Sequence, residues 1–275
     1  MRTLVAVTIS LAVVSAGVVT ACGQHTDQVT GTTTARPHPQ REAPAPGRAE
    51  PAHAVVAGPV NPDPRVGVIF LGGGDLHVCT GSVLHSPGGD LVLTAAHCLP
   101  AGFPVTFVPG FADAAPAGDV WTVTAVYLDP RWVAARDPRA DYAILRVSRA
   151  GGRSVEAQAG SAFTLGAAPA RGSRVTVTAY AAGVGGRPIG CQAGTGITAG
   201  GFPELPCAGL VDGTSGAPWV SGSTVTGVIG GLDGGGCTDD VSYSPPFDDH
   251  TAALVARAEA GGPGDTAPSG IDDPC

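Results

Sequence analysis

The feature that most constrains the fold is a series of short apolar runs separated by glycine-rich turns. These runs are VGVIFL (66–71), CTGSVLH (79–85), LVLT (91–94), WTVTAVYL (121–128), YAILRV (142–147), RVTVTAYA (174–181) and TVTGVIGG (224–231). Alternation of Val, Thr and aromatic residues over such lengths is typical of β-strands. Because no helix-length pattern separates the runs, an antiparallel sandwich or barrel is favoured over parallel βαβ units.

The composition agrees with an all-β fold that has a sizeable core. Apolar residues make up 43% of the 275 residues and charged residues 14%, while the 42 glycines and 25 prolines provide many turns. One segment, 248–260, has a helical pattern, with Asp248 or Asp249 as its N-cap and Gly261 as its stop. We expect the polar tail from Gly262 onwards to be loosely held.

The charged residues exclude several kinds of chemistry. All 15 basic residues are arginine, so a Schiff-base lysine, a P-loop lysine and a Ser-Lys dyad are absent. The net charge of −8 argues against a nucleic-acid partner.

The first 21 residues are typical of a secretory signal peptide. Met1-Arg2 precedes an uncharged apolar stretch that ends in VTAC, with Cys22 after small residues. This ending resembles a bacterial lipobox, which implies that Cys22 is lipidated and anchors the protein to the outer face of the cell membrane. An ordinary signal peptide and an uncleaved membrane anchor are the alternatives, and all three place the remaining chain outside the cytoplasm.

Residues 22–58 are predicted to form a disordered tether. They are rich in Thr, Pro and Ala and contain too few apolar residues to bury a core. The chain has seven cysteines, an awkward number for an exported protein. If Cys22 carries a lipid, six remain, which is enough for three disulfides in an oxidising compartment.

Three motifs carry the candidate chemistry: TAAHC (94–98), DYAIL (141–145) and GTSGAP (213–218). Each alone has an ordinary structural explanation, because a serine between glycines is commonly a turn and an aspartate can begin a strand. Together, and in this order, they resemble the trypsin/chymotrypsin family of serine peptidases. The resemblance implies two six-stranded antiparallel β-barrels with a C-terminal helix, over residues 59–261, followed by a tail at 262–275.

The resemblance also implies the role of each site residue. Ser215 would be the nucleophile, His97 its general base and Asp141 the group that orients the imidazole. The backbone N–H groups of Gly213 and Ser215 would form the oxyanion hole. The implied activity is that of a serine endopeptidase acting on proteins or peptides. We expect no cofactor and no metal, since His97 has no second ligand at metal-binding spacing, and we expect a monomer.

The resemblance further implies a disulfide between Cys79 and Cys98 that braces the histidine turn. The other four cysteines allow three pairings, of which we favour Cys191–Cys207 and Cys237–Cys275.

Two departures from the family pattern are informative. Thr214 replaces the aspartate that pairs with a new N-terminus in activated trypsin-like enzymes, so we expect a site that forms without N-terminal insertion, although VVAG (55–58) faintly resembles an activation site. Gly209 occupies the position of the aspartate that selects Arg or Lys substrates. Apolar or small substrate side chains are therefore favoured, with Asp233 as a feature that could favour a basic one.

Two other functions fit the sequence less well. One is a trypsin-like domain without catalytic activity that binds peptides or protein partners at the cell surface. The other is a β-rich structural lipoprotein in which the three motifs occur by coincidence.

Overall fold

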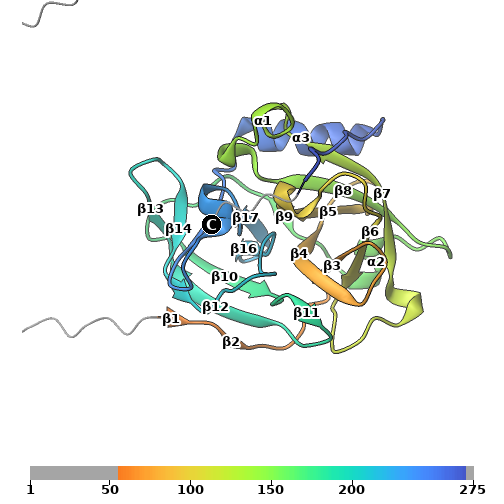
Figure 1. Ribbon diagram of the computed structural model, residues 1–275, viewed down its shortest axis with the longest axis horizontal. Coiled ribbons are helices and arrows are strands. Elements are labelled where there is room, and N and C mark those ends of the chain that lie inside the picture. The colour runs from red at the N-terminus through yellow and green to blue at the C-terminus, as the bar shows by residue number, and fades with distance from the viewer. Residues whose placement is uncertain (1–54, 271–275) are drawn as a thin grey trace, which may run out of the picture. The chain divides into compact units, whose positions relative to one another are not determined.

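The computed structural model describes residues 55–270, and its N-terminal half forms a closed β-barrel (Figure 1). Six antiparallel strands pair in the order β4-β3-β6-β7-β8-β5, and the pairing of β5 with β4 closes the ring. The strands are β3 (Val66–Leu71), β4 (Leu76–Leu84), β5 (Leu91–Thr94), β6 (Val105–Pro109), β7 (Trp121–Leu128) and β8 (Ala143–Ser148). This barrel contains the first five strands that the sequence predicts.

The C-terminal half is built around a second sheet of six strands, in the order β2-β12-β10-β16-β17-β9. Its pairings are antiparallel except that of the short β9 with β17, which is parallel. These strands are β2 (Gly58–Pro59), β9 (Thr164–Leu165), β10 (Arg174–Ala179), β12 (Ile189–Gly194), β16 (Pro218–Ser221) and β17 (Thr224–Val228).

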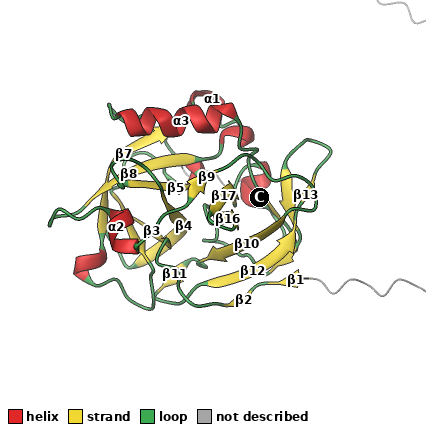
Figure 2. Ribbon diagram, turned by 180° about the vertical axis from the view of Figure 1, so that it is seen from behind, coloured by secondary structure: helices red, strands yellow, loops and turns green. Residues whose placement is uncertain are grey.

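Smaller pairings complete the fold. They involve β1 (Val55–Val56) with β15 (Cys207–Ala208), β11 (Gly183–Val184) with β4, and the sheet of β13 (Gly196–Ile197), β14 (Pro203–Leu205) and β18 (Ser242–Tyr243). The helices are α1 (Pro130–Ala135), α2 (Val155–Ala159) and α3 (Asp249–Ala260), with 3-10 turns η1 (Ala96–Cys98), η2 (Ala117–Asp119), η3 (Pro138–Ala140) and η4 (Leu232–Gly235). Strands dominate and helices are few, which confirms the predicted all-β class (Figure 2).

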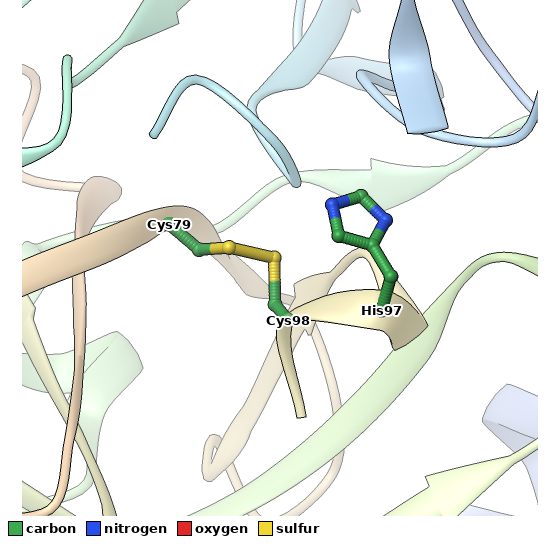
Figure 3. A group of neighbouring side chains, drawn as sticks. All are labelled: Cys79, His97 and Cys98. Atoms are coloured by element: carbon green, nitrogen blue, oxygen red, sulfur yellow. A yellow bond between two sulfur atoms is a disulfide. The ribbon is translucent and has the colours of Figure 1, made fainter. Parts of the chain in front are cut away.

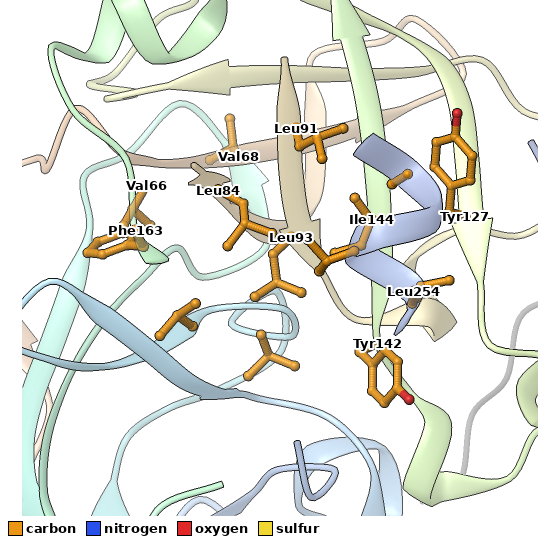
Figure 4. Packing of buried hydrophobic residues seen from close by; sticks show 14 of the residues in the cluster. Val66, Val68, Leu84, Leu91, Leu93, Tyr127, Tyr142, Ile144, Phe163 and Leu254 are labelled. Atoms are coloured by element: carbon orange, nitrogen blue, oxygen red, sulfur yellow. The ribbon is translucent and has the colours of Figure 1, made fainter. Parts of the chain in front are cut away.

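One of the two large core clusters joins the two halves of the molecule (Figure 4). Val66, Leu93 and Ile144 of the barrel pack in one buried cluster with Val225 of β17 and Leu254 of α3. Apolar burial of this kind contributes roughly 25 cal/mol per Å². The two halves are therefore held together by a shared core, which fixes the relative position of the residues at their junction.

Helix α3 forms where its sequence pattern predicts it. The Asp248 carboxylate caps the helix by accepting from the backbone of His250 and Thr251, and the Thr251 hydroxyl accepts from the Asp248 amide. This reciprocal arrangement satisfies amides that the first helical turn leaves without partners. Gly261, at φ 71°, ends the helix as expected.

The expectation of a loose tail after Gly262 was wrong for the residues that the structure describes. The Asp265 amide donates to the Val126 carbonyl at 2.7 Å, and the Asp265 carboxylate accepts from the Leu128 amide at 2.7 Å. Arg257 of α3 pairs with the same carboxylate. Further along, the Ala101 amide donates to the Pro268 carbonyl at 3.3 Å. The tail is thus held against β7 although its own sequence is polar.

The end of the predicted tether also takes part in the fold. Val55 pairs beside Cys207 and Gly58 beside Gly190, so the last residues of 22–58 lie in short strands. The predicted signal peptide, Cys22 and the rest of the tether lie outside the described residues. Over residues 55–270, no helix has the length and apolar character needed to span a bilayer.

Candidate active site

His97 lies on the short turn η1 that follows strand β5. The adjacent Cys98 is bonded to Cys79 of β4, and this disulfide fixes the turn to the barrel wall beside the imidazole (Figure 3). The His97 side chain is mostly enclosed, with 14% of its surface exposed. The turn after LVLT therefore holds the His97 imidazole in a fixed position beside the barrel wall.

Asp141 is buried directly behind this imidazole. Its Oδ2 lies 2.7 Å from His97 Nδ1, and its Oδ1 accepts the His97 backbone N–H at 2.9 Å. Burial would raise the pKa of Asp141, but the nearby His97 and the donated hydrogen bonds outweigh burial and hold that pKa below its usual value. The carboxylate is therefore ionised at neutral pH and fixes the orientation of the ring.

A main-chain donor that the sequence analysis missed completes the Asp141 site. The Gly231 N–H donates to Asp141 Oδ2 at 2.7 Å from the loop after β17. Gly231 has φ +82°, and a Cβ there would lie 2.8 Å from the Pro245 nitrogen and 3.0 Å from the Pro138 carbonyl oxygen. Only glycine fits this conformation and space without strain. The GG pair at 230–231 was the available signal, but it was assigned to the end of a strand.

Ser215 lies in the turn between β15 and β16, and the two glycines beside it are structurally required. Gly213 has φ +88° and Gly216 has φ +80°. An added Cβ would come within 2.1 Å of the Ala182 nitrogen at Gly213 and within 2.2 Å of Thr94 Oγ1 at Gly216. The GTSG sequence therefore bends tightly against the first barrel and the β10–β11 loop, and it holds Ser215 at their junction.

Thr80 of β4 attaches this turn to the first barrel. Its hydroxyl donates to the Gly213 carbonyl at 3.0 Å and accepts from the Tyr180 amide at 3.0 Å. The Thr80 amide also donates to the Ser215 carbonyl at 2.8 Å. Thr80 is fully buried. Sequence analysis did not identify Thr80, since a threonine in a strand carries no distinguishing signal.

Local hydrogen bonds hold the residues just before Ser215. The Thr214 side chain is buried, and both its hydroxyl and its amide donate to the Val211 carbonyl, at 2.7 and 3.1 Å. The Ala182 amide donates to the Asp212 carbonyl at 2.8 Å. This bond points the Asp212 carbonyl towards Ala182. The Gly213 N–H belongs to the same planar peptide and therefore points away from Ala182. Within residues 55–270, no protein group accepts the N–H of Gly213 or Ser215.

His97 and Ser215 line one open cavity of about 250 Å³. Its apolar part includes Leu210 and Ile229, both largely buried, and its polar part carries three aspartates. None of its lining residues is an arginine: they are His97, Leu210, Val211, Asp212, Thr214, Ser215, Ile229, Asp233, Gly234, Gly235, Gly236, Cys237 and Asp239. A peptide side chain would enter a negatively charged space with an apolar wall.

The group of Cys79, His97 and Cys98 has metal-ligand atoms within 4.8 Å of one another. Both sulfurs, however, are bonded to each other, and a disulfide offers no thiolate ligand. The group braces the histidine turn and is not a metal site.

The other three cysteines among the described residues are also disulfide-bonded. Cys191 and Cys207 form the second disulfide, which links β12 to β15. Cys237 is disulfide-bonded at the rim of the cavity. Its favoured partner, Cys275, lies outside the described residues. Disulfides are consistent with an extracellular location.

Comparison with known sequences identifies the family. The sequence model of the trypsin-like peptidase domain matches residues 79–232, which is more than half of the chain. The chain belongs to the trypsin-like peptidase family. No curated protein gives a significant match.

Several solved structures share the fold, two proteases among them. The protease Anisep from Arthrobacter nicotinovorans is 22% identical, with a TM-score of 0.64 over 75% of this chain and 100% of its own. The thermostable serine protease AL20 from an extremophilic microorganism is 22% identical, with a TM-score of 0.62 over 73% and 99%. Human heparin binding protein is 17% identical, with a TM-score of 0.59 over 77% and 100%. These likenesses confirm the chymotrypsin-like fold.

Proposed function

We propose that this trypsin-like peptidase is a serine endopeptidase that acts outside the cytoplasm. The observation that carries the proposal is the 2.7 Å contact between His97 Nδ1 and a buried, ionised Asp141, with His97 and Ser215 lining the same cavity. Asp141 fixes the imidazole tautomer, so that Nε2 is the nitrogen available as a base. His97 takes the Ser215 hydroxyl proton as Oγ attacks the substrate carbonyl.

The negative oxygen formed by this attack needs donors that are already in place. We assign this role to the N–H groups of Gly213 and Ser215. The Ala182–Asp212 hydrogen bond supports the assignment because it fixes this peptide plane with the Gly213 N–H pointing away from Ala182. Collapse of the tetrahedral intermediate releases the amine, which takes a proton from His97, and leaves an acyl-enzyme for water to hydrolyse.

We further propose that the cavity beside Ser215 prefers a side chain with an apolar stem and a positive end. Leu210 and Ile229 would contact the stem, and the carboxylates of Asp212, Asp233 and Asp239 would attract the charge. The sequence analysis favoured an apolar or small side chain and gave Asp233 as a feature that could favour a basic one. We propose the basic side chain, because two more aspartates line the same cavity. Digestion of a mixed peptide library, with Ser215→Ala as the control, reads this preference directly.

We propose that residues 1–21 direct export, that lipidated Cys22 anchors the protein to the membrane and that the residues between Cys22 and Val55 tether the folded domain. The lipobox-like VTAC and the disulfides of the domain support this arrangement. Mass spectrometry of the membrane fraction tests it, since Cys22→Ser should release the protein.

A fluorophosphonate probe tests the central proposal. Labelling of Ser215 is expected in the full chain and should be lost in His97→Ala and Ser215→Ala. His250→Ala is the matched control, because His250 is an exposed histidine on α3 and should leave labelling unchanged. Failure of the folded wild-type protein to label would favour a non-catalytic peptide-binding domain.

A further inference from the structure

A second cavity lies on the first barrel, apart from the catalytic one. Its volume is about 480 Å³, against about 250 Å³ for the cavity that His97 and Ser215 line, and the two share no residue. It is bordered by the β3–β4 turn, the loop after β6 and strand β11. Cavities of this size commonly bind ligands, and the catalytic chemistry proposed above uses none of the residues that line this one.

The floor of the second cavity is an ordered cluster of aromatic rings. Phe70 and Phe111 line it, are both buried, and pack edge to face with their ring centroids 6.0 Å apart. The buried His77 packs edge to face against both rings, and its Nε2 donates at 2.8 Å to the carbonyl of Gly185, which also lines the cavity. A floor that is already in place lowers the entropy cost of binding.

The mouth of the second cavity carries exposed apolar side chains. Val184 of β11 lines the cavity and is 74% exposed. It pairs directly with Leu76 of β4, which is 51% exposed (Figure 1). Residues directly opposite each other in an antiparallel pair have their side chains on the same face. Leu76 and Val184 therefore form one apolar patch, the β11 patch, which extends the cavity to the surface.

The charged residues at the second cavity are acidic. Asp75 and Asp113 line it, and no arginine does. Asp113 pairs with Arg187 at 2.9 Å, but both side chains are mostly exposed, so water weakens this pair. Asp75 has no ionic partner within residues 55–270. An occupant that carries a positive charge next to an apolar side chain would complement both the acidic groups and the apolar floor.

Strand β11 favours an extended peptide as this occupant. It is the terminal strand of its sheet, so one of its edges has no strand partner within residues 55–270. A peptide can add to such an edge through main-chain hydrogen bonds. The edge is also close to the catalytic groups, because Ala182 directly precedes β11 and its amide donates to the Asp212 carbonyl beside the Ser215 turn. A polypeptide held at Ser215 can therefore also contact β11.

We propose that the second cavity and the β11 patch bind protein substrates at a segment distinct from the cleaved bond, with an apolar side chain next to an arginine or lysine. Phe70 and Phe111 contact the apolar side chain, while Asp75 and Asp113 attract the positive charge. The site adds affinity only for chains long enough to reach both cavities. This inference rests on the proposed function.

Direct binding tests the second site without turnover. The full chain carrying Ser215→Ala is titrated with fluorescein-labelled Ala-Ala-Arg-Leu-Arg-Ala-Ala-amide, and fluorescence anisotropy gives Kd. Val184→Arg replaces an exposed apolar side chain by a charge of the same sign as the peptide, and should raise Kd at least about tenfold. Phe103→Arg is the matched control, since Phe103 is also exposed, at 52%, but does not line this cavity. It should leave Kd unchanged.

A second peptide tests the chemistry of the occupant. With glutamate in place of both arginines, the peptide should bind at least about tenfold more weakly, because the acidic residues repel it. Equal affinity for the two peptides, or no binding of either, would overturn the proposal. An unchanged Kd in Val184→Arg together with a raised Kd in Asp233→Asn would also overturn it, because the peptide would then bind only in the catalytic cavity.

Turnover tests whether the second site acts on substrates. Three fluorogenic peptides share the cleaved residue preferred in the peptide library, and two of them carry Arg-Leu-Arg on a Gly-Ser linker, one at each end. At least one longer peptide should have a KM about tenfold lower than the short one in the wild type, because linkage raises the local concentration of the second segment. Phe103→Arg should keep this advantage and Val184→Arg should lose it. The same ratio of KM values in both variants would contradict the second site.

Two further readouts separate the alternatives. A wild-type dimer in sedimentation that becomes a monomer in Val184→Arg would assign the β11 patch to a second copy of the chain and overturn the proposal. If the wild type fails to label with fluorophosphonate, the proposed function fails, while peptide binding to the Ser215→Ala chain still decides whether the second site exists.

Discussion

At the scale of single residues, the Thr80 hydroxyl joins the two halves of the site. It donates to the carbonyl of Gly213 and accepts from the amide of Tyr180, and all of these contacts are buried. An unpaired buried group costs about 1–3 kcal/mol. The position of the Ser215 turn thus depends on a side chain more than a hundred residues earlier.

Thr80→Val should lower the free energy of unfolding by about 1–3 kcal/mol, because the valine keeps the shape but leaves the Gly213 carbonyl and Tyr180 amide without partners. Urea unfolding measures the loss. The control is Ser82→Ala in the same strand, since Ser82 is buried and its hydroxyl has no partner within residues 55–270. If Thr80→Val is as stable as Ser82→Ala, the Thr80 hydroxyl does not hold the turn.

At the scale of elements, Asp129 holds together the segment that runs from the end of β7 to Tyr142. It caps α1 by accepting from the Arg131 amide at 2.8 Å, and its carboxylate also binds the Arg131 guanidinium and the Tyr142 hydroxyl. Burial would raise the pKa of Asp129, but these donors outweigh burial and lower the pKa to about 2. Tyr142 directly follows Asp141, so the network also stabilises the segment that places the Asp141 carboxylate beside His97.

Since the folded-state pKa of Asp129 lies below its unfolded value, the ionised carboxylate stabilises the fold above about pH 4, and this contribution is lost as the pH falls towards 2. Asp129→Asn should lower the free energy of unfolding by about 2 kcal/mol at pH 7 and by much less near pH 2. Denaturant unfolding at both pH values measures the difference. Asp240→Asn, an exposed site, serves as the control. An equal loss for Asp129→Asn at both pH values would contradict the pKa assignment.

The elements that sequence could predict are those whose signals are local. The alternating strands and the capped helix at 249–260 formed where their own residues direct them. Helices α1 and α2 were missed because six and five residues are too few for a helical period to show. The tail was misjudged because the hydrogen bonds between Asp265 and the backbone of Val126 and Leu128 cannot be seen in the composition of the tail.

The candidate site divides in the same way. His97, Asp141 and Ser215 stand in motifs that sequence can recognise. The Gly231 amide, the Thr80 hydroxyl and the Ala182 amide act through main-chain or common groups brought together only by the fold. Sequence therefore indicates the candidate catalytic groups, while the structure indicates which other groups hold them in place.

At the scale of the whole molecule, the chain holds its Ser215 turn without a charged N-terminus. Thr214 donates to the Val211 carbonyl, while Val55 and Val56 are exposed and paired beside β15. Cleavage just before Val55 should therefore change kcat/KM by less than about twofold. Turnover before and after limited proteolysis, with the new terminus confirmed by sequencing, measures this. A large rise in activity on cleavage would show that the new terminus organises the site.

The shared core between the two halves has a consequence for a newly made chain. His97 and Asp141 are synthesised well before Ser215, and the buried contacts of Thr80 with Gly213 and Tyr180 form only when the later residues dock. Under the proposed function, a polypeptide still leaving the ribosome would carry the general base without its nucleophile. The enzyme would therefore stay inactive until synthesis is nearly finished.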